Sequence, residues 1–205
     1  MSLRYKNYIF DFGKVIVEFE PEIMMAPYIT DKADRELAGD VIFDRLYWDR
    51  LDGGIITDSE VVAAIRERLP ERLGDAGVEV YRNWYHHLPF IEGMRELIKK
   101  IKDEGGRIFL LSNISIGFAK NYSLVEELKE LFSLFDGLVF SGPIGKVKPH
   151  AEIFQHLLDT YNISAEESIF IDDNLSNVTG ADKVGINGYL FDRNLERLQK
   201  ELFSN

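Results

Sequence analysis

The chain of 205 residues contains no cysteine, few prolines and no long apolar run. Without cysteine it can form neither disulfides nor thiolate zinc sites, and thiol catalysis is excluded. Its apolar runs are far shorter than the ~20 residues that a transmembrane helix needs, and the N-terminus lacks the pattern of a signal peptide. Basic residues are outnumbered, with 24 Lys and Arg against 35 Asp and Glu, which gives a formal net charge of -11. We therefore expect a cytoplasmic protein whose partner is neither nucleic acid nor a membrane.

Hydrophobic residues make up 45% of the chain, which is enough for one core of substantial size. From about residue 18 to residue 89 they recur at helical spacing, with almost no strand signal. This pattern predicts about four helices, with turns at 52–54 and 74–77, where glycines cluster. Thr57 or Asp58 would cap one of these helices.

Residues 1–17 and 90–205 show a different pattern, in which short apolar strands alternate with amphipathic helices. The expected strands are 8–11, 107–111, 137–140, 168–171 and 187–191, and the expected helices are 91–103, 124–135, 151–161, 175–184 and 195–203. This order predicts an α/β fold with a doubly wound, mostly parallel sheet and right-handed crossovers. The helical segment 18–89 would be an insertion into that fold.

Polar residues follow several of these strands at the point where each strand ends. They are Asp11, then Ser112 with Asn113, then Lys148 in the loop after the strand 137–140, and finally Asp172 with Asp173. Each motif alone is also typical of a turn or a helix cap. Because parallel strands end at one edge of a sheet, where open α/β folds bind ligands, we expect these residues to surround one crevice.

The acidic residues have a specific use if the substrate is a phosphate monoester. Asp11 is ionised at neutral pH and would attack phosphorus directly, which would give an aspartyl-phosphate. Asp11, Asp172 and Asp173 would hold Mg²⁺, and the carbonyl oxygen of Gly13 would be a further ligand. Adjacent carboxylates such as 172 and 173 repel each other and therefore favour a bound cation.

The remaining polar residues would contact the phosphoryl group or position the acids. Ser112 would donate its hydroxyl to a phosphoryl oxygen, and Asn113 beside it would take part in substrate binding. Lys148 would be a positive charge that faces both Asp11 and the phosphoryl group in the transition state. Asn177, one helical turn after the acidic pair, would orient that pair.

Four segments resemble, in their order along the chain, the four motifs of the haloacid dehalogenase (HAD) superfamily. They read IFDFGKV at 9–15, LSN at 111–113, KP at 148–149 and FIDDN at 170–174. The resemblance covers essentially the whole chain and implies a Rossmann-like core with residues 18–89 as an inserted helical cap. It also implies a Mg²⁺-dependent phosphohydrolase that acts on small phosphorylated molecules, with Asp11 as the nucleophile. Residues 148–156 and 172–177 are similar to the bacterial alpha-D-glucose-1-phosphate phosphatase branch.

One position departs from the pattern of most phosphatases of the superfamily. They have a second aspartate, a general acid and base, where this chain has Gly13; the glucose-1-phosphatase-like branch also has glycine there. A leaving group of low pKa needs a proton donor least, so we expect a sugar phosphate such as a hexose 1-phosphate. Two alternatives remain open: a metal-independent dehalogenase with the same nucleophile, and a non-catalytic binding or regulatory protein on the same scaffold.

The cap would cover the crevice and set specificity. Candidates for lining the crevice are Trp48, Arg50, Trp84, Tyr85, His86 and His87. Aromatic faces stack on sugars and histidines bind hydroxyl groups, but the two tryptophans are more typical of the core of a helical bundle. Lys14, beside the nucleophile, would contact the substrate or point to solvent.

Overall fold

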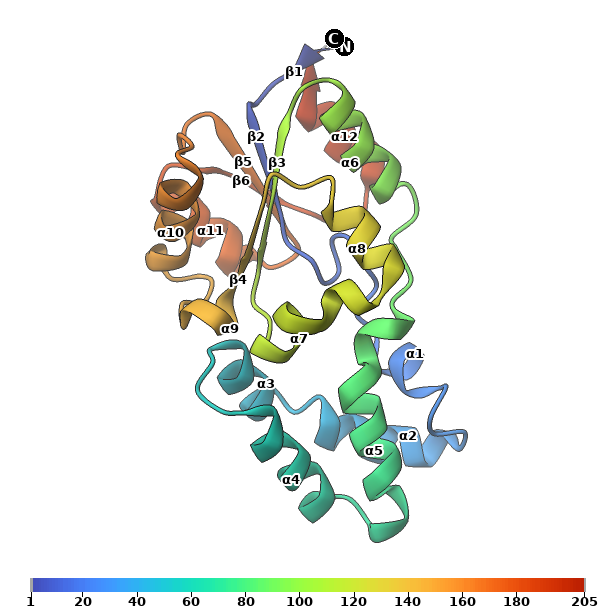
Figure 1. Ribbon diagram of the computed structural model, residues 1–205. Helices are drawn as coiled ribbons and strands as arrows, with labels where there is room; N and C mark the ends of the chain where they lie inside the picture. Colours follow the sequence, from blue (N-terminus) through green and yellow to red (C-terminus); the bar gives the residue numbers. More distant parts are fainter. Residues whose placement is uncertain (1, 205) are drawn as a thin grey trace.

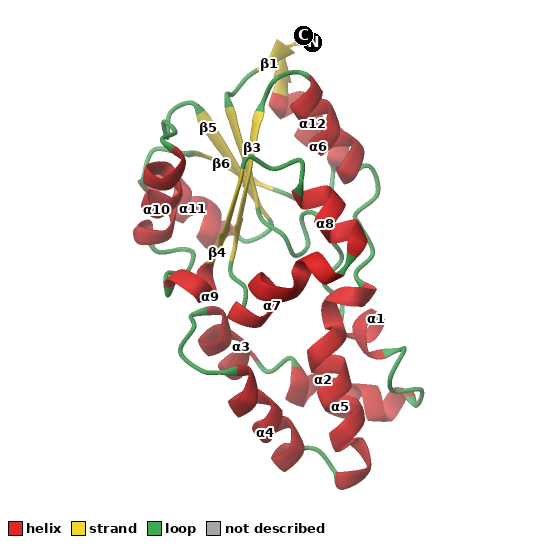
Figure 2. Ribbon diagram, viewed as in Figure 1, coloured by secondary structure: helices red, strands yellow, loops and turns green. Residues whose placement is uncertain are grey.

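The computed structural model describes residues 2–204, and its centre is a five-stranded sheet in the order β4-β3-β2-β5-β6 (Figures 1 and 2). The strands are β2 (Asn7–Phe10), β3 (Arg107–Ser112), β4 (Gly137–Phe140), β5 (Ser168–Asp172) and β6 (Asn187–Leu190). Every pair of neighbours in this sheet is parallel. The predicted α/β fold with a doubly wound parallel sheet is confirmed.

Helices cover both faces of this sheet, and the side chains of β2 alternate between them. Ile9 packs in one hydrophobic cluster with α10 (Ala151–Tyr161) and α11 (Leu175–Lys183). Tyr8 and Phe10 belong to a second cluster, with α6 (Met94–Asp103), α8 (Glu126–Phe132) and α12 (Leu195–Leu202). All four residues of β2 are buried, as expected for a strand covered on both sides.

Several short elements differ from the prediction. The helix expected at 124–135 is shorter and forms α8 alone, and it is preceded by two elements that were not predicted, α7 (Ile116–Asn121) and the 3₁₀ turn η2 (Tyr122–Leu124). The short helix α9 (Ser141–Ile144) was not predicted, nor was the antiparallel pair of β1 (Ser2–Leu3) and β7 (Phe203–Ser204). Segments this short contain fewer than two periods of a hydrophobic pattern, so periodicity does not reveal them.

The segment 18–89, called the cap segment below, is helical as predicted but contains more helices than the four expected. They are α1 (Pro21–Met25), α2 (Lys32–Ile42), α3 (Arg45–Asp52), α4 (Asp58–Arg68) and α5 (Glu71–Asn83), followed by the 3₁₀ turn η1 (Trp84–His87). Thr57 caps α4 through a capping box with Glu60, which confirms the predicted cap. A third hydrophobic cluster, made of cap-segment residues alone, holds these helices together.

The turn predicted at 74–77 is wrong, because both of its glycines lie inside α5. A Cβ atom on Gly77 would lie 2.5 Å from a methyl carbon of Leu69 and 3.1 Å from one of Ile65. Gly77 therefore lets α5 approach α4 closely. A Cβ atom on Gly74 would meet no atom within 4 Å.

The chain enters and leaves the cap segment at two points that lie side by side. Val17 and Phe90 form an antiparallel bridge, the Glu18 amide donates to the Pro89 carbonyl oxygen (2.8 Å), and the Ile91 amide donates to that of Ile16 (2.9 Å). These crossings coincide with the predicted boundaries of core (1–17 and 90–205) and cap (18–89), and the division into two domains stays a prediction. Within residues 2–204 no helix is long and apolar enough to cross a membrane; the cytoplasmic location also stays a prediction.

Candidate active site

The strands β2, β3 and β5 end at the same edge of the sheet. In the parallel register Phe10 lies opposite both Leu110 and Ile171, so Asp11, Ser112 and Asp172 come together as the sequence predicts. A cavity of about 740 Å³ opens at this edge. The predicted site residues that line it are Asp11, Gly13, Ser112, Asn113, Lys148 and Asp173. Asp172 lies behind them and is fully buried.

Lys148 links two of the carboxylates. Its Nζ lies 2.7 Å from Asp11 Oδ1 and 2.7 Å from Asp172 Oδ2. Burial lowers the pKa of Lys148, but the two carboxylates raise it by more, so its pKa lies above the ordinary value. The ammonium group is therefore positively charged at neutral pH. The sequence predicted its contact with Asp11 but not its contact with Asp172.

The side chain of Asn113 holds the backbone of the lysine loop. Its Oδ1 accepts from the Lys148 amide (2.8 Å), and its Nδ2 donates to the Lys148 carbonyl oxygen (3.0 Å). Both polar atoms of the side chain are thus engaged with Lys148. A direct contact between Asn113 and substrate stays a prediction.

Asp172 is held by a set of donors on all sides. The Asn174 amide donates to its Oδ1 (2.8 Å), and Asn177 Nδ2 lies 3.1 Å from each of its oxygens. Together with Lys148 these donors orient and charge-balance a carboxylate that has no access to solvent. Asn177 therefore orients Asp172, one member of the acidic pair.

The three aspartates form a group that fits a divalent cation. Asp11, Asp172 and Asp173 each offer a carboxylate oxygen, and these oxygens lie within 4.8 Å of one another. Burial raises the pKa of Asp11 to about 7, against the opposing charge of Lys148, and burial followed by the charge of Asp172 raises the pKa of Asp173. Hard oxygen donors that repel one another are the ligands Mg²⁺ prefers. Asp11 and Asp173 face the cavity and would be its direct ligands.

The cap segment supplies the opposite wall of the cavity. Trp48 and Trp84 line it, whereas Arg50, Tyr85, His86 and His87 are not among its lining residues. His87 instead lies 2.9 Å from the Tyr28 hydroxyl. The indole of Trp48 donates to the Ile42 carbonyl oxygen (2.5 Å), and both tryptophans are almost fully buried. They therefore belong to the hydrophobic core and also form part of the cavity wall.

Several lining residues were missed by the sequence reasoning. They are Phe19, Glu20, Pro21, Phe43, Arg45, Asp49 and Asp52 from the cap segment, and Asn174 and Ser176 from the core. Lys14, which the sequence left undecided, also lines the cavity. The missed cap residues carry no motif: Asp52 precedes two glycines and resembles an ordinary helix end.

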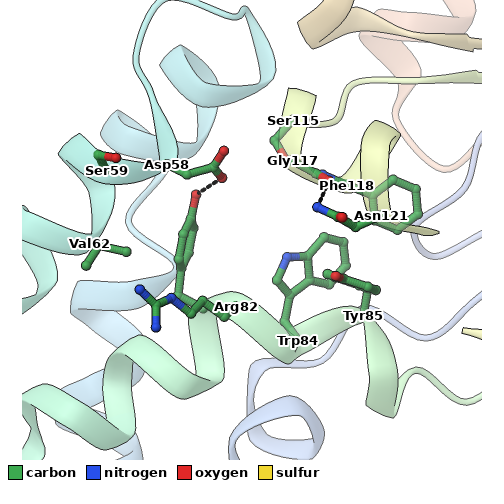
Figure 3. Close-up of a pocket in the computed structure, with 11 residues that line it drawn as sticks. Asp58, Ser59, Val62, Arg82, Trp84, Tyr85, Ser115, Gly117, Phe118 and Asn121 are labelled. Carbon is green, nitrogen blue, oxygen red and sulfur yellow. Dashed lines mark hydrogen bonds between the residues drawn. The ribbon is translucent and has the colours of Figure 1, made fainter. Parts of the chain in front are cut away.

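A second, smaller cavity of about 410 Å³ lies between the cap segment and α7. In Figure 3 Trp84 and Tyr85 rise from one side and Phe118 and Asn121 face them from α7. Tyr81 donates to Asp58 Oδ1 (2.7 Å), so its hydroxyl is engaged within the wall. Trp84 lines both cavities.

Comparison with known proteins agrees with this geometry. The family described as haloacid dehalogenase-like hydrolase matches residues 5–185. The chain therefore belongs to this family and is a hydrolase, which confirms the resemblance drawn from the four motifs.

The similar proteins include phosphatases of nearly the same length. The chain is 27% identical over 191 residues to a sesquiterpene phosphatase of Aspergillus oryzae, which covers 92% of this chain and 90% of that protein. It is 26% identical over 183 residues to a D-ribitol-5-phosphate phosphatase of Bacteroides thetaiotaomicron, with 84% and 85% covered. A HAD family enzyme of Bacteroides thetaiotaomicron, solved with magnesium and inorganic phosphate, shares the fold with a TM-score of 0.67, 22% identity and 93% and 96% coverage.

Proposed function

We propose that this hydrolase is a Mg²⁺-dependent phosphatase that cleaves small phosphate monoesters through an aspartyl-phosphate on Asp11. The observation that carries the proposal is the group of Asp11, Lys148 and Asp173 at the edge of the sheet, facing one cavity. That the similar proteins include phosphatases supports this choice over dehalogenation.

The contacts of Asp11 suggest which oxygen would attack. Its Oδ1 accepts from the Phe12 amide (2.7 Å) and from Lys148 Nζ (2.7 Å), which leaves Oδ2 as the freer atom. We therefore assign the nucleophilic attack to Oδ2. Lys148 would hold Asp11 in place and add positive charge where the phosphoryl oxygens lie in the transition state.

The other residues would bind and orient the phosphoryl group. Ser112 would donate its hydroxyl to a phosphoryl oxygen, with backbone amides of the loop at Asn113. Asp11, Asp173 and the Gly13 carbonyl would hold Mg²⁺, with Asp172 behind them. Bound Mg²⁺ would offset the repulsion between the carboxylates and the anionic substrate and would favour the ionised form of Asp11.

For the substrate we propose a sugar phosphate, such as a hexose 1-phosphate. The cavity combines aromatic walls from Trp48 and Trp84 with the polar side chains of Arg45 and Asp49, and this mixture suits a sugar ring and its hydroxyl groups. A purely apolar alcohol would form no hydrogen bonds with these two side chains. The likeness to the glucose-1-phosphate phosphatase branch stays a prediction.

Phosphate release from a panel of hexose, pentitol, prenyl and aryl phosphates tests the proposal. We expect turnover with Mg²⁺, none with a chelator, and none for Asp11→Asn, with Asp103→Asn on the exposed end of α6 as the matched control. Mass spectrometry of acid-quenched enzyme should show one added phosphoryl group on wild type only. Activity that survives in Asp11→Asn would overturn the assignment of Asp11 as the nucleophile. A preference for prenyl phosphates would overturn the proposal that the substrate is a sugar phosphate.

A further inference from the structure

The site lacks a proton donor where the family resemblance leads one to expect it, at Gly13. A Cβ atom on Gly13 would meet only the side chain of Phe19, at an ordinary distance of 3.6 Å. Space for a side chain therefore exists, and the chain lacks the acid for another reason. A different carboxylate reaches the same cavity from the cap segment: Asp52, the last residue of α3.

The backbone of Asp52 is held firmly against the core. The Ser141 hydroxyl donates to the Asp52 carbonyl oxygen (2.5 Å) across the boundary between cap segment and core. Two residues further on, a Cβ atom on Gly54 would lie 2.5 Å from the Gly142 carbonyl oxygen, and Gly54 itself has a φ of +68°. The end of α3 thus rests on α9, with which it is in contact. This contact places Asp52 before any substrate enters.

Asp52 is half-buried, and one oxygen of its side chain lacks a hydrogen-bond partner. Its Oδ1 has no hydrogen-bond partner within residues 2–204 and almost no exposed surface. A buried carboxylate oxygen without a donor is costly in free energy, and few are found in folded proteins without a functional reason. Asp52 lines the cavity that holds Asp11 and Lys148, so its carboxyl group lies beside the place where a substrate would bind.

Burial of Asp52 favours its protonated form near neutral pH. Burial raises its pKa to about 7; Asp49 and Asp11 add to the rise, and Arg45 and Lys148 oppose it. Arg45 is itself paired with Asp49 at 2.7 Å. A carboxyl group that titrates near the working pH can both give and take a proton.

We propose that Asp52 is the general acid and base of the reaction, supplied by the cap segment in place of a side chain at position 13. As Oδ2 of Asp11 bonds to phosphorus, the P–O bond to the leaving group breaks, and its electron pair stays on the leaving oxygen. That oxygen takes the proton of the Asp52 carboxyl group and departs as an alcohol. The Asp52 carboxylate then takes a proton from the water that attacks phosphorus, which releases phosphate and restores Asp11.

This inference rests on the proposed function and changes one expectation drawn from Gly13. Without any donor, only esters of acidic alcohols would be cleaved rapidly. With Asp52 as the donor, phosphates of ordinary sugar hydroxyls become substrates as well. The role of Asp52 is therefore tested by replacing it and asking how strongly the resulting loss of activity depends on the leaving group.

The test compares wild type, Asp52→Asn and Asp40→Asn on p-nitrophenyl phosphate and on the alkyl ester that wild type cleaves best. The quantity compared is kcat/KM, because it covers the steps up to departure of the leaving group and not the later attack of water. We expect Asp52→Asn to lose about 10²- to 10⁴-fold on the alkyl ester and only a few-fold on p-nitrophenyl phosphate, whose leaving group needs no proton. A matched control, Asp40→Asn, removes the same charge from an exposed position of the cap segment outside the cavity, so it should show no such difference between substrates.

Two further measurements separate a catalytic role from a structural one. With p-nitrophenyl phosphate, Asp52→Asn should release a burst of nitrophenol and then turn over slowly, because water attack on the aspartyl-phosphate has lost its base. Adding Gly13→Asp to Asp52→Asn should restore part of the activity on the alkyl ester. Equal losses on both substrates, or none on either, would overturn the role of Asp52 and leave Asp11 intact. Turnover by Asp11→Asn would instead contradict the proposed function itself.

Discussion

Replacing Asp52 by asparagine should stabilise the protein, by an amount that grows with pH. The folded-state pKa of Asp52 is raised by burial from 3.8 to about 7. Between these values the folded state keeps a proton that the unfolded state has lost, so the free energy of unfolding falls as pH rises. Asparagine resembles the neutral acid and does not titrate, so it contributes no such loss of stability as pH rises. About three pKa units at 1.36 kcal/mol each give a maximum difference of about 4 kcal/mol above neutral pH.

Urea unfolding without Mg²⁺, followed by tryptophan fluorescence, measures this difference. Between about pH 5 and pH 8 the stability gap between Asp52→Asn and wild type should widen by about 2–3 kcal/mol. Taking the difference between the two proteins removes the direct titration of Asp11, which both retain. A gap that is constant with pH, or that narrows, would refute the burial of an unpartnered carboxylate at Asp52.

Further predictions concern packing and the charges of the site. Gly77→Ala should lower the free energy of unfolding by about 1–3 kcal/mol through overpacking, whereas Gly74→Ala, on the same helix with open space around it, should raise it by up to ~1 kcal/mol; the reverse order in denaturant melts would contradict the account of α5. Lys148→Met should destabilise the fold by about 3–5 kcal/mol, because it leaves Asp172 buried without its counter-charge, and unchanged stability would argue against the ion pair. Asn177→Ala should weaken Mg²⁺ binding about 10- to 100-fold by calorimetry through loss of the donor to Asp172, and unaltered affinity would remove Asn177 from the site.

The sheet and its edge could be predicted from sequence because their signals are strong. The apolar runs before Asp11, Ser112 and Asp172 are fully buried strands, and parallel pairing brings their ends together without knowledge of any contact. The order of the polar residues then located the cavity. The same reasoning failed at Gly77, where a glycine is needed for helix packing and not for a turn.

The contribution of the cap segment to the site could not be predicted in the same way. Asp52 lies 41 positions from Asp11 along the chain, and only the packing of α3 on α9 places it at the cavity. Nothing in a helix that ends in Asp-Gly-Gly distinguishes a catalytic carboxylate from a turn. The contact of Lys148 with Asp172 as well as Asp11 was missed for a similar reason. Side-chain geometry decides which of Asp172 and Asp173 turns inward, and the sequence does not show it.

The bridge between Val17 and Phe90 makes the cap segment an insertion whose two ends lie next to each other. Bridge partners lie about 5 Å apart, so a tight turn could close the core after excision of everything between them. The packing energy of the cap segment is less easily separated from that of the core. Trp84 stacks on Phe118 of the core at 5.6 Å between ring centroids, and Trp48 belongs to the same hydrophobic cluster as Phe10. Exchanging caps between relatives would therefore require these aromatic contacts to be transplanted together with the helices.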